Sequence, residues 1–117
     1  MKKFLTFQSS HGSALSLAEQ FGLLADPLRL QIVESLAREH LCTCHLIEIT
    51  GARQTTISHH LRILREAHVI LGEAQGRFTW YRLAPGAFAD GLMHLKGIAS
   101  AGDYTPRLRR LRLVCAP

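Results

Sequence analysis

The stretch QTTISHHLRILREA at residues 54–67 combines a narrow apolar stripe with a face of hydrogen-bonding side chains. Ile57, Leu61 and Leu64 recur at helical spacing and predict a helix that buries one face. The opposite face carries small hydroxyl and amide groups, which let a helix approach base edges in the major groove of DNA. We therefore expect a recognition helix, with the arginines suited to phosphates and the other side chains to bases or phosphates. Its candidate DNA contacts are Gln54, Thr55, Thr56, Ser58, His59, Arg62 and Arg65.

The flanking sequence predicts a turn before this helix and a β-hairpin after it. A brief apolar helix is expected to end at Gly51, where glycine can adopt the left-handed conformation that turns the chain. Residues 69–71 and 78–83 are rich in β-branched and aromatic side chains and predict two strands, joined by a glycine-bearing loop over 72–76. Arg77 at the hairpin tip is placed to reach a DNA backbone or minor groove. Helix, turn, helix and hairpin together predict a winged helix-turn-helix fold, mainly α with a small β-hairpin.

Three amphipathic segments complete the predicted domain. Residues 13–24 predict a helix with a capping box of Ser16 and Glu19, and Asp26 followed by Pro27 predicts the start of a helix over 27–37. A last helix is expected to open at Pro85. Because a small domain buries little surface, the apolar seam of that helix favours pairing with a second copy. The seam residues are Phe88, Leu92, Leu95 and Ala99.

Length and composition favour one globular domain. The chain has 117 residues, of which 47% are hydrophobic and 20% charged, so residues 1–117 are treated as a single folded unit, with no structure assigned to the arginine-rich tail 103–117. Residues 1–50 carry four basic and five acidic side chains, whereas residues 51–117 carry ten and four. A positive field confined to the second half favours a polyanionic partner such as double-stranded DNA.

Several classes of protein are not expected from this sequence. It has no run of 18 apolar residues and no signal-peptide pattern, so we expect no membrane partner. Its three cysteines do not suggest a disulfide framework, which favours a reducing, cytoplasmic setting. No nucleotide-binding glycine motif, zinc-protease motif or nucleophile elbow occurs, so we expect neither an enzyme nor an organic cofactor. A winged helix that binds RNA, or serves as a protein adapter, remains an alternative.

Three blocks of the sequence resemble the ArsR/SmtB family of metal-sensing transcriptional repressors. They are LADPLRL at residues 24–30, QTTISHHLRILREA at 54–67 and GRFTWYRL at 76–83, and the resemblance covers roughly residues 14–100. It implies a homodimeric winged helix whose first and last helices build the dimer interface. It also implies that the ion-free dimer binds operator DNA and that an inducing ion releases it.

The segment LCTCHL at residues 41–46 is a candidate sensor for a soft ion. Two thiolates within three residues can chelate As(III), Sb(III), Cd(II), Pb(II), Hg(II) or Zn(II). Residues i and i+2 point about 200° apart in a regular helix, so both sulfurs can hold one ion only if Cys42 precedes the helix or the first turn is distorted. The segment is similar to the Leu-Cys-x-Cys-Asp-Leu box of the arsenic- and cadmium-sensing branches, with His45 in place of Asp. Ile47 stands where the resemblance implies a third cysteine.

The third ligand is therefore open. Cys115 is the remaining thiol and the first candidate, and His45, His11 or an exogenous thiol are the others. Two further interpretations of the cysteines stand beside the metal site: small buried hydrophobic residues, or a thiol redox switch that uses Cys42, Cys44 and Cys115. A zinc or nickel site on the last helix is not expected, because Asp90, His94 and Asp103 lack the spacing that the resemblance implies.

Overall fold

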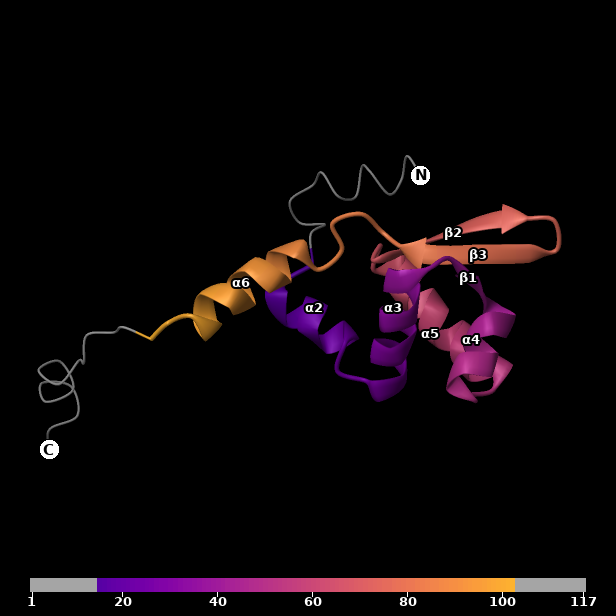
Figure 1. Ribbon diagram of the computed structural model, residues 1–117, viewed down its shortest axis with the longest axis horizontal. Helices are drawn as coiled ribbons and strands as arrows, with labels where there is room; N and C mark the ends of the chain where they lie inside the picture. The colour runs from indigo at the N-terminus through magenta and orange to yellow at the C-terminus, as the bar shows by residue number, and fades with distance from the viewer. Residues whose placement is uncertain (1–14, 103–117) are drawn as a thin grey trace, which may run out of the picture.

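The computed structural model describes residues 15–102 and shows helices packed around a small antiparallel sheet (Figure 1). Along the chain the elements are α2 (Leu17–Leu23), α3 (Pro27–Arg38), β1 (Leu41–Cys42), α4 (Thr43–Thr50), α5 (Gln54–Glu66), β2 (Ile70–Gln75), β3 (Phe78–Leu83) and α6 (Ala89–Ala99). This order confirms the predicted winged helix-turn-helix, in which α4 and α5 form the helix-turn-helix and β2 and β3 form the wing. The predicted tail 103–117 lies outside the described residues.

The first two helices start at the predicted caps. The Ser16 hydroxyl accepts the Glu19 N–H at 3.1 Å, and the Glu19 carboxylate accepts the Ser16 N–H at 2.9 Å, so the capping box is confirmed. Asp26 Oδ1 accepts the N–H groups of Leu28 and Arg29 at 2.9 and 3.0 Å and caps α3. Because Ser16 is the cap, α2 begins at Leu17, later than the predicted residue 13.

The core lies between α3, α4, α5 and the sheet. The apolar stripe predicted on α5 is buried there, since Ile57 and Leu64 are fully buried and Leu61 is 2% exposed. Ile32 on α3 and Leu46 on α4 face the same core and are also fully buried. Gly51 ends α4 with a φ of 76°, the left-handed conformation predicted for the turn. This packing fixes the helix-turn-helix and leaves the polar face of α5 toward solvent.

The sheet is larger than the sequence predicted. Its strand order is β1-β3-β2, so β3 lies between the wing strand β2 and the short strand β1, which was not predicted. The predicted loop over 72–76 was wrong, because β2 continues to Gln75 and the turn shrinks to Gly76 and Arg77. Gly72 is a strand residue for a packing reason: a Cβ there would lie 3.0 Å from Cε1 of Tyr81.

The prediction that Pro85 opens the last helix was also wrong. Gly86 and Phe88 both have positive φ, 77° and 64°, which breaks the helical path, and α6 begins at Ala89. The helix packs beside α2, at the end of the molecule opposite the wing turn (Figure 1). Gly91 N–H donates to Gln20 Oε1 at 3.1 Å, and a Cβ at Gly91 would lie 2.8 Å from that oxygen.

The outer face of α6 is apolar and exposed. Exposed fractions are 63% for Leu92, 66% for Met93, 47% for Leu95 and 61% for Ile98. Of the predicted seam, Leu92 and Leu95 lie on this face, whereas Phe88 packs against the core. Across residues 15–102, no helix combines the length and the apolar character needed to cross a membrane.

Candidate metal centre and DNA-binding surface

The two central cysteines lie at the junction of strand β1 and helix α4. Cys42 is the last residue of β1 and the N-cap of α4, with extended backbone angles of −98° and 173°, and Cys44 lies in the first helical turn. The two Sγ atoms are 2.8 Å apart, and both cysteines are free thiols. Cys42 thus precedes the helix, which is one of the two arrangements that allow both sulfurs to face one ion.

The surroundings of the two thiols favour a thiolate at Cys42. Cys42 is 3% exposed, and burial alone would raise its pKa. Hydrogen bonds from the Cys44 thiol and from the N–H groups of His45 and Cys44 outweigh this effect, so the pKa of Cys42 is lowered. The pKa of the exposed Cys44 is raised, first by its hydrogen bond to Cys42, then by burial and by the charge on Cys42. Of the two thiols, Cys42 at the helix N-terminus is therefore the one whose deprotonation is favoured.

His45 is the third possible metal ligand at this junction. Its Nδ1 accepts the Cys42 N–H at 3.2 Å and lies 3.2 Å from Cys42 Sγ, so the imidazole completes a capping box at the start of α4. Its ring centroid is 5.5 Å from that of Trp80 on β3, with the planes tilted by 43°. The capping role explains how a histidine stands where the resembling motif has aspartate, because both side chains can accept this N–H.

The donors fit a thiophilic ion. Within residues 15–102, one group of three ligand-type residues could share an ion. It consists of Cys42, Cys44 and His45, whose ligand atoms all lie within 4.8 Å of one another. In tetrahedral zinc geometry, two sulfurs bound at about 2.3 Å stand about 3.8 Å apart, so that ion would open the pair by roughly 1 Å from its present 2.8 Å, and an ion with narrower bond angles would open it less. The predicted ligand Cys115 and the alternative His11 lie outside the described residues.

The predicted DNA-contacting side chains share one face of α5 and the wing tip. All eight predicted residues, including Arg77, are exposed. A shallow depression on α5 is lined by Gln54, Thr55, Ser58, His59 and Arg62. Thr56 and Arg65 complete the polar face, and Arg77 lies in the turn between β2 and β3, at the far end of the wing. The polar face of α5 and the cation at the wing tip are therefore both open to solvent.

Sequence reasoning missed a polar cluster behind α5. His60 is 8% exposed, and its Nδ1 lies 3.3 Å from the guanidinium of Arg29, which also donates to the carbonyl oxygens of Leu23 and Gly22 at 2.8 and 3.4 Å. His60 Nε2 lies 4.0 Å from Asp26 Oδ1. Burial lowers the pKa of His60, although the Asp26 charge opposes this. A signal existed, because His60 follows Ile57 by three residues and falls on the apolar stripe.

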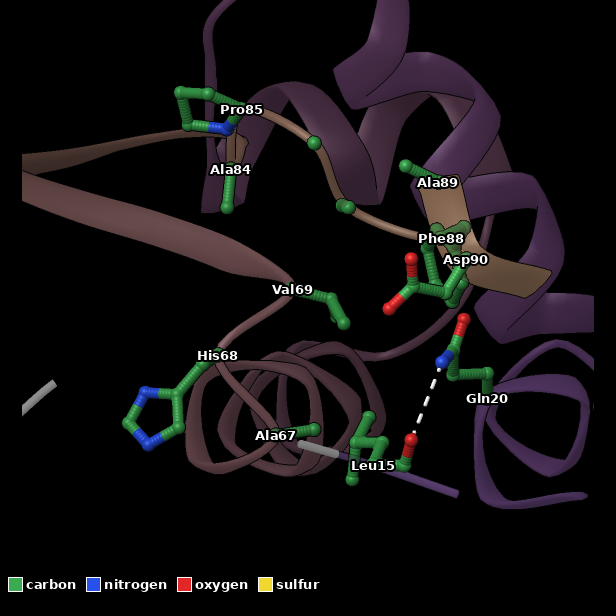
Figure 2. A pocket seen from close by; sticks show the side chains of 12 residues that line it. Leu15, Gln20, Ala67, His68, Val69, Ala84, Pro85, Phe88, Ala89 and Asp90 are labelled. Carbon is green, nitrogen blue, oxygen red and sulfur yellow. Dashed lines mark hydrogen bonds between the residues drawn. The ribbon is translucent and has the colours of Figure 1, made fainter. Parts of the chain in front are cut away.

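A separate pocket of about 280 Å³ lies where α2, the base of the wing and the start of α6 meet. Figure 2 shows it between His68, Gln20, Phe88 and Asp90, with the Gln20 side chain donating to the Leu15 carbonyl at 3.2 Å. None of the predicted site residues within the described range lines this pocket.

The sequence is similar to known bacterial regulatory proteins. The sequence signature of the bacterial regulatory proteins of the arsR family matches residues 26–70. A transcriptional repressor SmtB homolog from Synechocystis is 41% identical over 71 residues, which are 61% of this chain and 54% of that protein. The chain thus spans about half the length of that relative. The arsenical resistance operon repressor of Staphylococcus aureus is 32% identical over 69% of this chain and 78% of its own length.

A solved structure agrees with the fold. The homodimeric winged helix-turn-helix DNA-binding domain of a possible ArsR-family regulator from Mycobacterium bovis aligns with a TM-score of 0.59 and 26% identity. The alignment covers 71% of this chain and 77% of that one.

Proposed function

This chain belongs to the arsR family of bacterial regulatory proteins, and we propose that it is a metal(loid)-responsive repressor that binds operator DNA as a homodimer. A soft ion such as As(III) or Sb(III), or else Cd(II) or Pb(II), would act as the inducer and release the DNA. The observation that carries the proposal is the group of Cys42, Cys44 and His45 at the N-terminus of α4, the helix that comes directly before the recognition helix.

The DNA side of the proposal rests on α5 and the wing. The hydrophobic stripe of α5 is buried and its small polar side chains are exposed, as groove entry requires. We assign base contacts to the first turns, at Gln54, Thr55, Thr56, Ser58 and His59, and phosphate contacts to Arg62, Arg65 and Arg77. The family consists of DNA-binding regulators, which agrees with a non-enzymatic role.

The dimer in this proposal uses the exposed apolar face of α6 together with α2. Four large apolar side chains exposed on one short helix, Leu92, Met93, Leu95 and Ile98, are costly in water and suit a second copy. The similar Mycobacterium bovis domain is homodimeric. We treat residues 1–117 as one domain, and we place the protein in the cytoplasm, where free thiols stay reduced.

The induction step follows from the positions of the ligands. A bound ion supplies strong bonds to sulfur that fix the distance between the two sulfurs. To bind the same ion as Cys42, Cys44 would have to lose its thiol proton to solvent, and the two sulfurs would separate. If His45 turns its Nδ1 to the same centre, Cys42 N–H loses its hydrogen-bond acceptor and the start of α4 loosens. Because α4 leads through Gly51 into α5, this change reaches the recognition helix; Cys115 remains a proposed further ligand.

A thiol redox switch is the second candidate, and the contact between the two sulfurs favours it. The Cys42 thiolate can attack a peroxide oxygen, which releases one water and leaves a sulfenic acid on Cys42. Cys44 can then attack that sulfur and displace its hydroxyl as a second water, so two thiols and one peroxide yield a disulfide and two waters. Cys115 is an alternative partner in such a disulfide.

Fluorescence anisotropy on the protein's own upstream DNA separates these functions. Fully reduced protein should bind one duplex far more tightly than random DNA, and As(III), Sb(III), Cd(II) or Pb(II), but not Ni(II), should release it. Cys42→Ser and Cys44→Ser should bind DNA normally but no longer respond, with Ser35→Ala as a control away from the site. Release by peroxide but by no ion would favour the redox switch, and equal binding of all duplexes would refute the repressor.

A further inference from the structure

Strand β3 connects the cysteine site to the wing through one residue, Trp80. In the sheet order β1-β3-β2, Trp80 lies directly opposite Cys42 on one side and Glu73 on the other. Directly opposite residues in an antiparallel pair project from the same face of the sheet, so the side chains of Cys42, Trp80 and Glu73 form one row. Figure 1 shows the short β1 beside β3, with the wing turn at the far end of the same strand.

The indole also meets the third donor of the site. The His45 ring lies 5.5 Å from the Trp80 ring, at a tilt of 43°. This distance is within the range at which aromatic rings attract one another. Trp80 therefore touches the sensor twice, through the backbone pairing of β1 and through the imidazole. It is partly buried, so its position depends on these neighbours.

Ion binding changes both of these contacts. Cys42 is buried at the end of β1, so opening the sulfur pair by up to roughly 1 Å, through side-chain rotation or through backbone movement, changes the packing of β1 against β3. Turning Nδ1 of His45 toward an ion tilts its ring against the indole. Three residue steps along β3, about 10 Å, separate Trp80 from Arg77 in the wing turn. Because a paired strand is stiff along its length, a displacement at Trp80 changes the direction in which the turn, and Arg77 within it, points.

We propose that Trp80 is a positioning residue that transmits ion binding at Cys42, Cys44 and His45 into the wing. The inducer then weakens the DNA contact of Arg77 as well as that of the recognition helix. This inference rests on the proposed function, and it adds a route that does not pass through Gly51.

The natural chain provides a direct probe, because Trp80 is its single tryptophan. In the wild-type protein without DNA, As(III) or Cd(II) should change Trp80 emission with the same midpoint as ion uptake, measured by competition with a thiol chelator. Cys42→Ser should abolish the change. Unaltered emission during full ion uptake would overturn the inference without any variant at Trp80.

Coupling is then measured as the ratio of DNA dissociation constants with and without ion. Trp80→Leu should retain ion uptake and ion-free DNA binding within about threefold, yet reduce the coupling ratio by more than about threefold. Trp80→Phe keeps an aromatic ring beside His45 and should restore most of the coupling. Phe78→Leu is the matched control, since it removes an exposed ring from the same strand, opposite Gln75 and away from the cysteines.

The outcomes distinguish a failure of the proposed function from a failure of the Trp80 route alone. If wild-type protein takes up no ion and no ion releases its DNA, the proposed function fails and the Trp80 route fails with it. If wild-type protein responds normally but Trp80→Leu keeps its full coupling ratio, the proposed function stands and the Trp80 route is overturned. The salt dependence gives a second check, because the ion should flatten it more in wild-type protein than in Arg77→Ala, which has already lost the wing contact.

Discussion

Replacing Arg77 by alanine should change the salt dependence of DNA binding by a calculable amount. Arg77 is exposed in the two-residue turn of the wing and forms no ion pair with another of the described residues, so its charge is available to a phosphate. Each phosphate contact contributes about 0.9 to the slope of log affinity against log salt, so a dimer that loses two such contacts loses about 1.8. Between about 50 and 200 mM salt, the affinity advantage of wild-type protein over the variant should shrink about 12-fold.

Anisotropy titrations at several salt concentrations, on the operator and on a scrambled duplex, measure this slope. The loss should be equal on both duplexes, because a phosphate contact carries no sequence information. Arg77→Lys keeps the charge and should keep the slope. Equal slopes for wild-type protein and Arg77→Ala would refute the placement of the wing tip at the DNA backbone, and a loss on the operator alone would indicate base contact instead.

Three further changes test other parts of the structure. Asp26→Ala should lower the melting temperature by a few degrees, whereas Asp26→Asn should nearly preserve it, because asparagine also caps helices; thermal unfolding checks both. His60 has a lowered pKa in the folded state, so its contribution to stability is present above its ordinary value of 6.5 and is lost as the pH falls further. His60→Gln should therefore flatten the fall in melting temperature on acidification. Leu92→Asp places a charge on the exposed face of α6 and should shift the protein toward monomer in analytical ultracentrifugation without unfolding it.

The features that the sequence predicted well are set by neighbouring residues. The caps at Ser16 and Asp26 and the left-handed turn at Gly51 depend on contacts within three or four positions. The buried face of α5 follows from helical spacing alone. These local preferences agree with the final packing, which is why the winged helix could be predicted.

The features that the sequence did not predict depend on distant partners. Strand β1 has two residues, too few for a pattern, and exists because β3 pairs with it. Gly72 suggested a loop, yet it lies in β2 because the Tyr81 ring occupies the space of its missing side chain. The chain from Pro85 to Phe88 suggested a helix start, but Gly86 and Phe88 have positive φ, Phe88 packs against the core, and α6 begins only at Ala89.

Part of the candidate metal site could be predicted from the sequence and part could not. Its two sulfurs could be predicted from their spacing and chemistry, together with the condition that Cys42 precede the helix. The place of His45 as cap and neighbour of Trp80 could not, because it depends on the register between β1 and β3. Cys115 stays a prediction, since it lies outside the described residues.

The position of Cys42 relative to Cys44 depends on the register between β1 and β3, and this dependence has a thermodynamic consequence. Both sulfurs face one centre because pairing with β3 holds Cys42 in extended conformation, and β3 is also the strand that positions the wing. A DNA complex that holds the wing in one position also holds β1, and so opposes the separation of the two sulfurs. By linkage, the factor by which an ion weakens DNA binding equals the factor by which DNA weakens ion binding. Under the proposed function, the ion affinity of the free protein should therefore exceed that of the operator complex, and the protein should respond to the lowest ion concentration when the wing is not bound to DNA.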